Sequence, residues 1–240
     1  MMFVYGRNPV REAIRGPRSV KRVWATKHTL RESWLADLDA PVSAASAEEI
    51  EGLCGSTEHQ GVCAEVSHFV YAHASSLLEG RGPRGGAEPL IVVLDQIQDP
   101  QNLGAICRTA ECVGASGMVI PERRAAEVTA AVCKASAGAV EHIPVARVRN
   151  IADFLAEAKR AEMWCYGADA NASLSYDAVD YSGGVVLVLG SEGRGLRPRV
   201  AQSCDALVAI PLRGQISSLS VSASAAVLLY AAGSGRKAHA

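Results

Sequence analysis

Five short, mostly apolar runs recur through the second half of the chain, each of a length that suits one β-strand. They are LIVVLD (90–95), GMVIP (117–121), EMWCYGA (162–168), GVVLVLG (184–190) and DALVAIP (205–211). Alanine-rich stretches with helical periodicity separate most of them, at 102–114, 125–137, 150–160 and 218–232. Apolar strands that alternate with helices predict an α/β fold in which a buried parallel sheet has helices on both faces.

The residues before this region indicate a smaller α/β unit. Residues 8–15 (NPVREAIR) predict a helix opened by Asn8, with Pro9 at its first position. The further expected elements are a strand at 20–26, a helix at 29–38, an extended piece at 41–45, a helix at 47–53 and a strand at 61–69.

A segment without apolar periodicity separates the two units. Residues 79–88 (EGRGPRGGAE) are rich in glycine, arginine and proline, which is the composition of a flexible linker. We therefore expect an N-terminal domain at 1–72, a linker at 73–88 and a C-terminal domain at 89–240.

Composition excludes several classes of protein. Of the 240 residues 49% are hydrophobic, which is enough for a substantial core, yet no uninterrupted apolar run reaches membrane-spanning length. The N-terminus has arginines and no apolar signal-peptide core, so we expect a cytoplasmic protein with no membrane partner. The seven cysteines form no C-x-x-C pair or zinc-ligand spacing, which predicts reduced thiols and no metal site.

The charge of the chain is unevenly distributed. The formal net charge is −1, which taken alone argues against an acidic partner such as RNA. Within residues 1–31, however, eight basic residues stand against Glu12 as the one acidic residue. This segment is either a phosphate-contacting surface or a solvated basic helix face, and charge alone does not distinguish the two.

Polar side chains follow three of the predicted strands, at the sheet edge where ligands of such folds bind. Asn102 and Arg108 follow the first strand, Glu192 lies in the glycine-rich turn GSEGRGL (190–196), and Ser218 and Ser220 precede the last helix. Each has a plain structural alternative. Asn102 could cap a helix, the serines could cap the last helix, and Glu192 could pair with a nearby arginine.

Taken together, the three segments predict a small-molecule or nucleotide pocket built mainly from backbone. They contain no nucleophile–base pair or metal cluster that would indicate a hydrolase. A dinucleotide-binding oxidoreductase needs G-x-G-x-x-G after an early strand and an acidic residue about twenty positions on. It is rejected because the order here is G-x-x-G-x-G and position 210 is isoleucine. These patterns do not name the reaction.

The same segments resemble the three signature motifs of the SpoU-type RNA 2′-O-ribose methyltransferases, a branch of the α/β-knot methyltransferases. The matching stretches are DPQNLGAICRTA, VLVLGSEGRGL and IPLRGQISSLSVSASAAVLLY, in the family's order and spacing. YGRNPVREAI and HQGVCAEV (59–66) are similar to the L30e-like substrate-binding domain of one subgroup. That subgroup methylates a guanosine in the peptidyl-transferase region of large-subunit (23S) ribosomal RNA.

The resemblance implies a C-terminal domain with a deep trefoil knot, which would form the pocket for S-adenosylmethionine, and a homodimer that completes the active site. Backbone groups near six residues would hold the cofactor, namely Leu189, Gly190, Ile210, Pro211, Ser218 and Leu219. The implied catalytic residues are Arg108, Asn102, Glu192 and Ser218. Arg108 would orient the ribose, because a guanidinium stays protonated and is a poor base. The expected RNA contacts are Arg7, Arg11, Arg15 and His59.

Two positions depart from the family pattern. Ser220 stands where most members have asparagine, and Ala231 replaces a common glutamate. Serine keeps a hydrogen-bond donor and an acceptor, so we expect activity to be retained. The alternatives within this chemistry are a transfer-RNA ribose methyltransferase and a resistance enzyme that modifies another ribosomal site. A non-catalytic RNA-binding or ribosome-assembly protein of the same fold is the alternative of another class.

Overall fold

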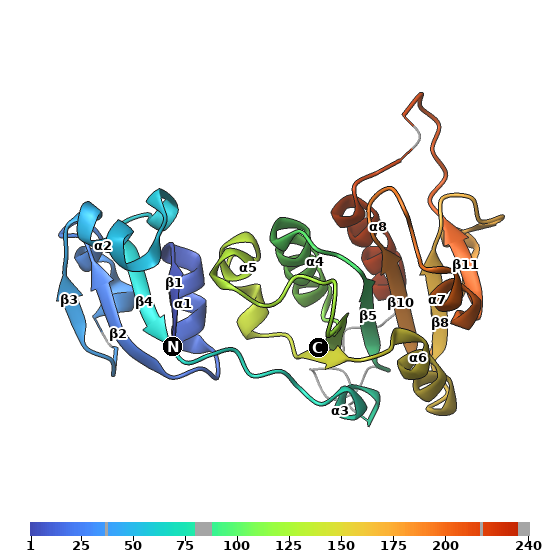
Figure 1. Cartoon of the computed structure of the whole chain (residues 1–240), viewed down its shortest axis with the longest axis horizontal. Coiled ribbons are helices and arrows are strands. Elements are labelled where there is room, and N and C mark those ends of the chain that lie inside the picture. Colours follow the sequence, from blue (N-terminus) through green and yellow to red (C-terminus); the bar gives the residue numbers. More distant parts are fainter. Residues whose placement is uncertain (37, 80–87, 217, 235–240) are drawn as a thin grey trace.

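The structure, a computed structural model, describes the whole chain except residues 37, 80–87, 217 and 235–240. Two sheets, one in each half of the chain, lie side by side in it (Figure 1). Half of the predicted linker, from 80 to 87, falls outside the described residues. Its first part contains a short helix, α3 (Ala74–Glu79), that the composition did not indicate, and Leu77 of this helix is buried.

The N-terminal unit is a four-stranded sheet with the order β1-β4-β2-β3. Its strands are β1 (Met2–Tyr5), β2 (Val20–Ala25), β3 (Val42–Ala44) and β4 (Val62–Val66). Its helices are α1 (Arg7–Arg15) and α2 (Ala47–Cys54). Strand β4 is antiparallel to both β1 and β2, whereas β2 and β3 are parallel. The sequence patterns missed β1, which pairs along the outer side of β4.

Two details of this unit correct the predictions. Helix α1 begins at Arg7 after Gly6, so Asn8 lies inside the helix and does not open it. The predicted helix at 29–38 is two 3₁₀ turns, η1 (Thr29–Arg31) and η2 (Ser33–Leu35). Thr29 and Leu35 are both buried. One α-helix would place residues six positions apart on different faces, so two separate turns are needed to bury both side chains.

The C-terminal unit is a seven-stranded, fully parallel sheet with the order β7-β6-β5-β10-β8-β11-β9. The strands are β5 (Leu90–Asp95), β6 (Gly117–Pro121), β7 (Val145–Val148), β8 (Trp164–Ala168), β9 (Leu174–Ser175), β10 (Val185–Gly190) and β11 (Ala206–Ala209). The predicted parallel sheet is confirmed. Strands β7 and β9 were not predicted, since both are short, and each pairs with one neighbouring strand.

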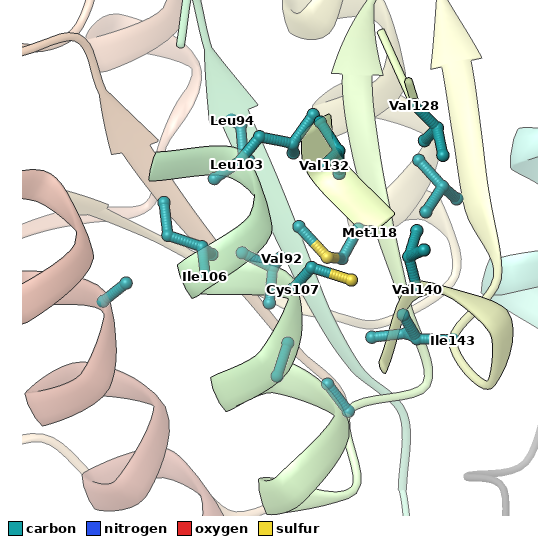
Figure 2. Close-up of a cluster of buried hydrophobic side chains, with 14 of the residues drawn as sticks. Val92, Leu94, Leu103, Ile106, Cys107, Met118, Val128, Val132, Val140 and Ile143 are labelled. Atoms are coloured by element: carbon teal, nitrogen blue, oxygen red, sulfur yellow. The ribbon is translucent and has the colours of Figure 1, made fainter. Parts of the chain in front are cut away.

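Helices cover both faces of this sheet, as predicted. They are α4 (Pro100–Val113), α5 (Ala130–Ala135), α6 (Ile151–Arg160), α7 (Pro198–Ser203) and α8 (Val221–Ser234). Alternate residues of β5 point to opposite faces, so Val92 and Leu94 pack with α4 whereas Ile91 and Val93 pack with α6. Figure 2 shows the first of these layers, where side chains of α4, β5 and β6 interdigitate.

The two units meet through a buried ion pair. Arg18, which follows α1, donates two hydrogen bonds to the carboxylate of Glu141, and the side chains are 3% and 0% exposed. Glu141 ends the short turn η4 (Ala139–Glu141) of the C-terminal unit. Glu12 also pairs with His142 at 2.8 Å, and Lys134 donates to the backbone oxygen of Glu58 at 2.7 Å. These contacts set the position of the N-terminal unit relative to the sheet that carries the site.

Candidate active site

The carboxyl ends of β10, β8 and β11 surround a cavity of about 340 Å³. Strand β10 lies between β5 and β8, where the chain order of the strands switches, and open α/β sheets bind ligands at such a point. The cavity is lined by apolar side chains of Leu189, Val208, Ile210, Leu219 and Leu228. Polar groups of Asn171, Glu192 and Ser218 also line it, so the cavity suits a ligand with both apolar and polar parts.

The glycine-rich turn after β10 forms one wall of this cavity. Ser191 and Gly195 exchange backbone hydrogen bonds of 3.1 and 2.9 Å, which close the turn. A Cβ atom added to Gly190 would lie 2.1 Å from the carbonyl carbon of Gly195, so only glycine allows this approach of the two backbones. The turn therefore brings backbone groups to the cavity edge, as the sequence predicted.

A second cavity of about 340 Å³ adjoins the first. Residues of the loop after β5 and the start of α4 line it, including Gln96, Gln98, Asp99 and Asn102. The two cavities share a wall, which is made of Ser191, Glu192, Arg194 and Val221. Two ligand groups bound in these cavities would therefore meet at the shared wall.

Glu192 joins the three polar segments at this wall. Its Oε1 accepts a hydrogen bond from Asn102 Nδ2 at 3.4 Å and another from the backbone N–H of Val221 at 3.3 Å. The loop after β5, the turn after β10 and the start of α8 thus meet at one carboxylate. Among the described residues no ion pair joins Glu192 to an arginine, and Arg197 pairs with Asp95.

The structure adds a residue that the sequence patterns missed. Asp95, the last residue of β5, is fully buried and accepts hydrogen bonds from the backbone N–H and the Nε of Arg197, at 2.9 and 2.8 Å. This pair links the end of β5 to the segment after the glycine-rich turn, behind Glu192. The sequence did contain a signal for this residue, since Asp95 is a carboxylate at the end of an otherwise apolar strand. A buried charge requires a partner, so a buried Asp95 predicts a basic residue nearby.

The structure brings most of the predicted cofactor residues together. Leu189, Gly190, Ile210, Ser218 and Leu219 all line the first cavity. Pro211 is exposed and does not line it. Ser220 accepts a hydrogen bond from the backbone N–H of Ala223 at 3.2 Å, so it caps α8.

Arg108 is not brought to either cavity. It is exposed on α4, and among the described residues no hydrogen bond or ion pair involves its guanidinium. Asn102 lies six residues earlier on the same helix and points to a different side, because six helical steps rotate a side chain by about 240°. Within one copy of the chain, Arg108 is therefore separate from the other predicted catalytic residues.

The residues predicted to contact RNA occupy different environments. Arg7 pairs with Glu32 and Arg15 pairs with Glu12, both at 3.2 Å, at positions where the arginines stay partly open to solvent. The Nε of Arg11 is buried without a hydrogen-bond partner in the described residues. His59 is only 7% exposed, and its Nδ1 accepts the N–H of Gly61 at 3.0 Å, so it holds the turn before β4.

Within the described residues, no group of three or more histidine, cysteine, aspartate or glutamate side chains is arranged to hold a metal ion. No helix in that part of the chain has the length and apolar character needed to cross a membrane. All seven cysteines are free, and Cys112 alone among them is exposed. Trp164 is 56% exposed.

Comparison with known families identifies the C-terminal unit. Residues 89–230 match the model of the SpoU rRNA Methylase family. The chain belongs to the SpoU methylase family. Residues 3–72 match the family's model for RNA 2′-O ribose methyltransferase substrate binding, which covers most of the N-terminal unit. The predicted family, the α/β fold with a substrate-binding domain and the class of RNA methyltransferase are confirmed.

Known proteins similar to this chain agree with that assignment. It is 36% identical to YacO of Bacillus subtilis, named as a TrmH family tRNA/rRNA methyltransferase, over 95% of this chain and 93% of YacO. The AdoMet-bound rRNA methyltransferase from Sinorhizobium meliloti is 26% identical, with a TM-score of 0.77 over 96% of this chain and 86% of that one. The SpoU methyltransferase AviRb of Streptomyces viridochromogenes, solved with AdoMet, shares the fold at 23% identity, with a TM-score of 0.80 over 97% and 89%.

Proposed function

We propose that this protein transfers a methyl group from S-adenosylmethionine to the ribose 2′-hydroxyl of a guanosine in large-subunit ribosomal RNA. The observation that carries the proposal is the pair of adjoining cavities with Glu192 in their shared wall. Methyl transfer needs a donor and an acceptor oxygen held in line and in contact. Two neighbouring cavities that share lining residues suit this requirement, because each can hold one reactant beside the other.

The first cavity fits S-adenosylmethionine. Its volume lies within the range of small-molecule sites, and its apolar walls suit a nucleoside ring while the glycine-rich turn offers backbone hydrogen bonds. The carboxylate of Glu192 at its edge favours a positively charged group such as a sulfonium. When bound, this cofactor would supply an electrophilic methyl group: the C–O bond to the 2′-oxygen would form as the S–CH3 bond breaks, leaving a neutral thioether, and the hydroxyl proton would pass to water.

The chain's own residues would orient the acceptor. Asn102, held by its hydrogen bond to Glu192, lines the second cavity and presents its amide to a ribose there. Val221 donates its N–H to the same carboxylate, so the wall between the cavities is fixed from α8 as well. A rigid wall keeps the two reactants in register, which is the contribution that positioning makes to such reactions.

We also propose that two copies of the chain form the active enzyme. Arg108 is exposed and remote from the cavities of its own copy, and α4, which carries it, packs beside α8. Apolar side chains are exposed on α8 and on the segment before it, namely Leu212, Ile216, Leu219 and Tyr230. Figure 1 shows that the segment between β11 and α8, which carries three of them, stands clear of the body. A homodimer would cover these side chains and bring Arg108 of the second copy to the acceptor.

The N-terminal unit favours ribosomal RNA over transfer RNA as the substrate. The solved rRNA methyltransferase named above aligns over nearly the whole chain, with the N-terminal unit included. We place the reaction in the cytoplasm, where ribosomal RNA is assembled into subunits. Transfer RNA is the alternative substrate, and the experiment below distinguishes the two.

The test is methyl transfer from labelled S-adenosylmethionine to large-subunit ribosomal RNA that lacks 2′-O-methyl groups, with transfer RNA assayed in parallel. The wild type should label one guanosine ribose of the ribosomal RNA. Arg108→Ala should reduce transfer by about 100-fold or more, because it removes a group that stabilises developing charge. Arg199→Ala, at an exposed arginine of α7 that pairs with Asp153, is the matched control and should keep full activity. Label in transfer RNA alone would overturn the assignment of the substrate.

A further inference from the structure

The residue after β5 has an unusual backbone conformation. Gln96 has a φ of 62°, in the left-handed region that glycine adopts without cost. A glutamine there is strained relative to glycine, because its Cβ crowds the neighbouring backbone. Five non-glycine residues in the described chain have positive φ, and Gln96 alone among them lines either of the two cavities.

The neighbours of Gln96 hold this conformation in place. Asp95, before it, is buried and bonded to Arg197. Ile97, after it, is buried, and its carbonyl accepts the N–H of Ala126 at 2.8 Å. With both neighbours pinned, the backbone turns sharply at Gln96, whose side chain contributes to the wall of the second cavity.

The amide of Gln96 is available for a ligand. Asp99, in the same cavity, uses Oδ1 to accept the N–H of Gln101 at 3.0 Å, and Asn102 and Glu192 bond to each other. No hydrogen bond among the described residues involves the Gln96 side chain. A carboxamide carries a donor and an acceptor side by side, which matches the paired donor and acceptor atoms on the edge of a nucleobase.

We propose that Gln96 contacts the base of the acceptor nucleotide and helps to select which base is methylated. The inference rests on the proposed function, since it assigns the second cavity to the acceptor. It also accounts for a glutamine at a position where the backbone favours glycine, because the contact between the side chain and the base offsets the backbone strain.

The test uses four transcripts of the stem-loop around the mapped ribose, which differ only in having G, A, C or U as the acceptor base. Gln96→Gly removes the side chain and relieves the backbone strain, so the loop keeps its shape. We expect the preference of the wild type for one base to fall about 10-fold in this variant, because loss of one hydrogen bond to the base weakens discrimination by that order. Binding of S-adenosylmethionine, measured by calorimetry, should stay unchanged.

Glu162→Gly is the matched control. Glu162 also has positive φ, at 60°, but it is exposed in the turn before β8 and lines neither cavity. This variant should keep the wild-type base preference. An unchanged preference in Gln96→Gly, or an equal loss of transfer to all four RNAs, would overturn the inference and leave the proposed function standing. If the wild type transferred methyl groups to none of the four RNAs, both the inference and the proposed function would be overturned.

Discussion

The junction between the two units and the wall between the two cavities both depend on a glutamate, but the two glutamates are used differently. Glu141 is fully buried, and both of its oxygens accept from Arg18. Glu192 is exposed, and among the described residues its two hydrogen bonds both go to Oε1, at 3.3 and 3.4 Å. Saturated polar groups fix a structure, whereas polar groups with spare hydrogen-bonding capacity are available to ligands.

The electrostatics of Arg18 show how complete the pairing at the junction is. Burial alone lowers the pKa of a guanidinium, but the hydrogen bond to Glu141 and the nearby charges outweigh burial, so the pKa of Arg18 is raised. The neighbouring thiol of Cys133 has its pKa raised to about 11 by burial, although Arg18 opposes this shift. The arginine therefore stays charged and the thiol stays neutral at physiological pH.

Breaking the junction should have the largest effect. Glu141→Gln leaves the charge of Arg18 buried without a counter-ion, and we expect the free energy of unfolding to fall by about 3–5 kcal/mol. Denaturant unfolding monitored by circular dichroism measures this loss. Glu65→Gln, at the exposed Lys21–Glu65 pair of 3.4 Å, is the control and should cost less than about 1 kcal/mol. A similar loss in the two variants would contradict our view of the junction.

Changing the carboxylate at the cavities should affect the reaction more than the fold. Glu192→Gln removes the charge beside the first cavity and weakens the hold on Asn102, so we expect kcat to fall about 100-fold. The free energy of unfolding should stay within about 0.5 kcal/mol of wild type, because the residue is exposed. Labelled methyl transfer and denaturant unfolding measure the two quantities, with Glu157→Gln on the exposed side of α6 as the control. Unchanged turnover would show that Glu192 is only structural.

Ser220 should make a smaller contribution, to the start of α8. Ser220→Ala removes the cap on the N–H of Ala223, and we expect a loss of about 1 kcal/mol in the free energy of unfolding. Ser220→Asn, which keeps a capping side chain, should retain both stability and activity. If the wild type were inactive and the Ser220→Asn variant active, the expectation that serine at this position supports activity would be refuted.

The smallest effect concerns an exposed ion pair at the amino end of β11. Lys159 and Asp205 lie 2.9 Å apart, and their hydrogen bond raises the pKa of Lys159. A lysine whose pKa is higher in the folded than in the unfolded state stabilises the fold. This contribution is complete at pH values below the unfolded pKa of about 10.4 and is lost as the pH rises through the folded pKa. Lys159→Gln should therefore cost about 0.2–1 kcal/mol at pH 7 and nothing at a pH above the folded pKa. A difference in thermal stability that persists at high pH would contradict this assignment.

The sequence patterns predicted the long elements and missed the short ones. Strand β10 is apolar along its length and α4 has a strong apolar period, so both were predicted close to their observed bounds. Strand β7 has the short sequence VARV and carries Arg147, so neither its length nor its polarity indicated a strand. Trp164 begins β8 and is 56% exposed, with its ring stacked on that of Tyr166, although Val185 beside it in the sheet is buried.

The candidate site was predicted in part for a similar reason. The motifs named Asn102, Glu192 and Ser218, and the structure places all three at the two cavities. Asp95 was missed because its partner Arg197 lies 102 residues away. The deep knot that the resemblance implies stays a prediction, as does the role of Arg108.

Local sequence was sufficient to define the strands, the helices and the motifs that end them, because hydrophobic periodicity and turn chemistry act over a few residues. Only the tertiary structure decided which motifs meet. Glu192 reaches Asn102 across 90 residues because β10 lies beside β5 in the sheet, and strand order depends on packing between distant parts of the chain. Helix geometry alone puts Arg108 on a different side of α4 from Asn102, and the packing of α4 in the fold decides that Asn102, and not Arg108, lines a cavity.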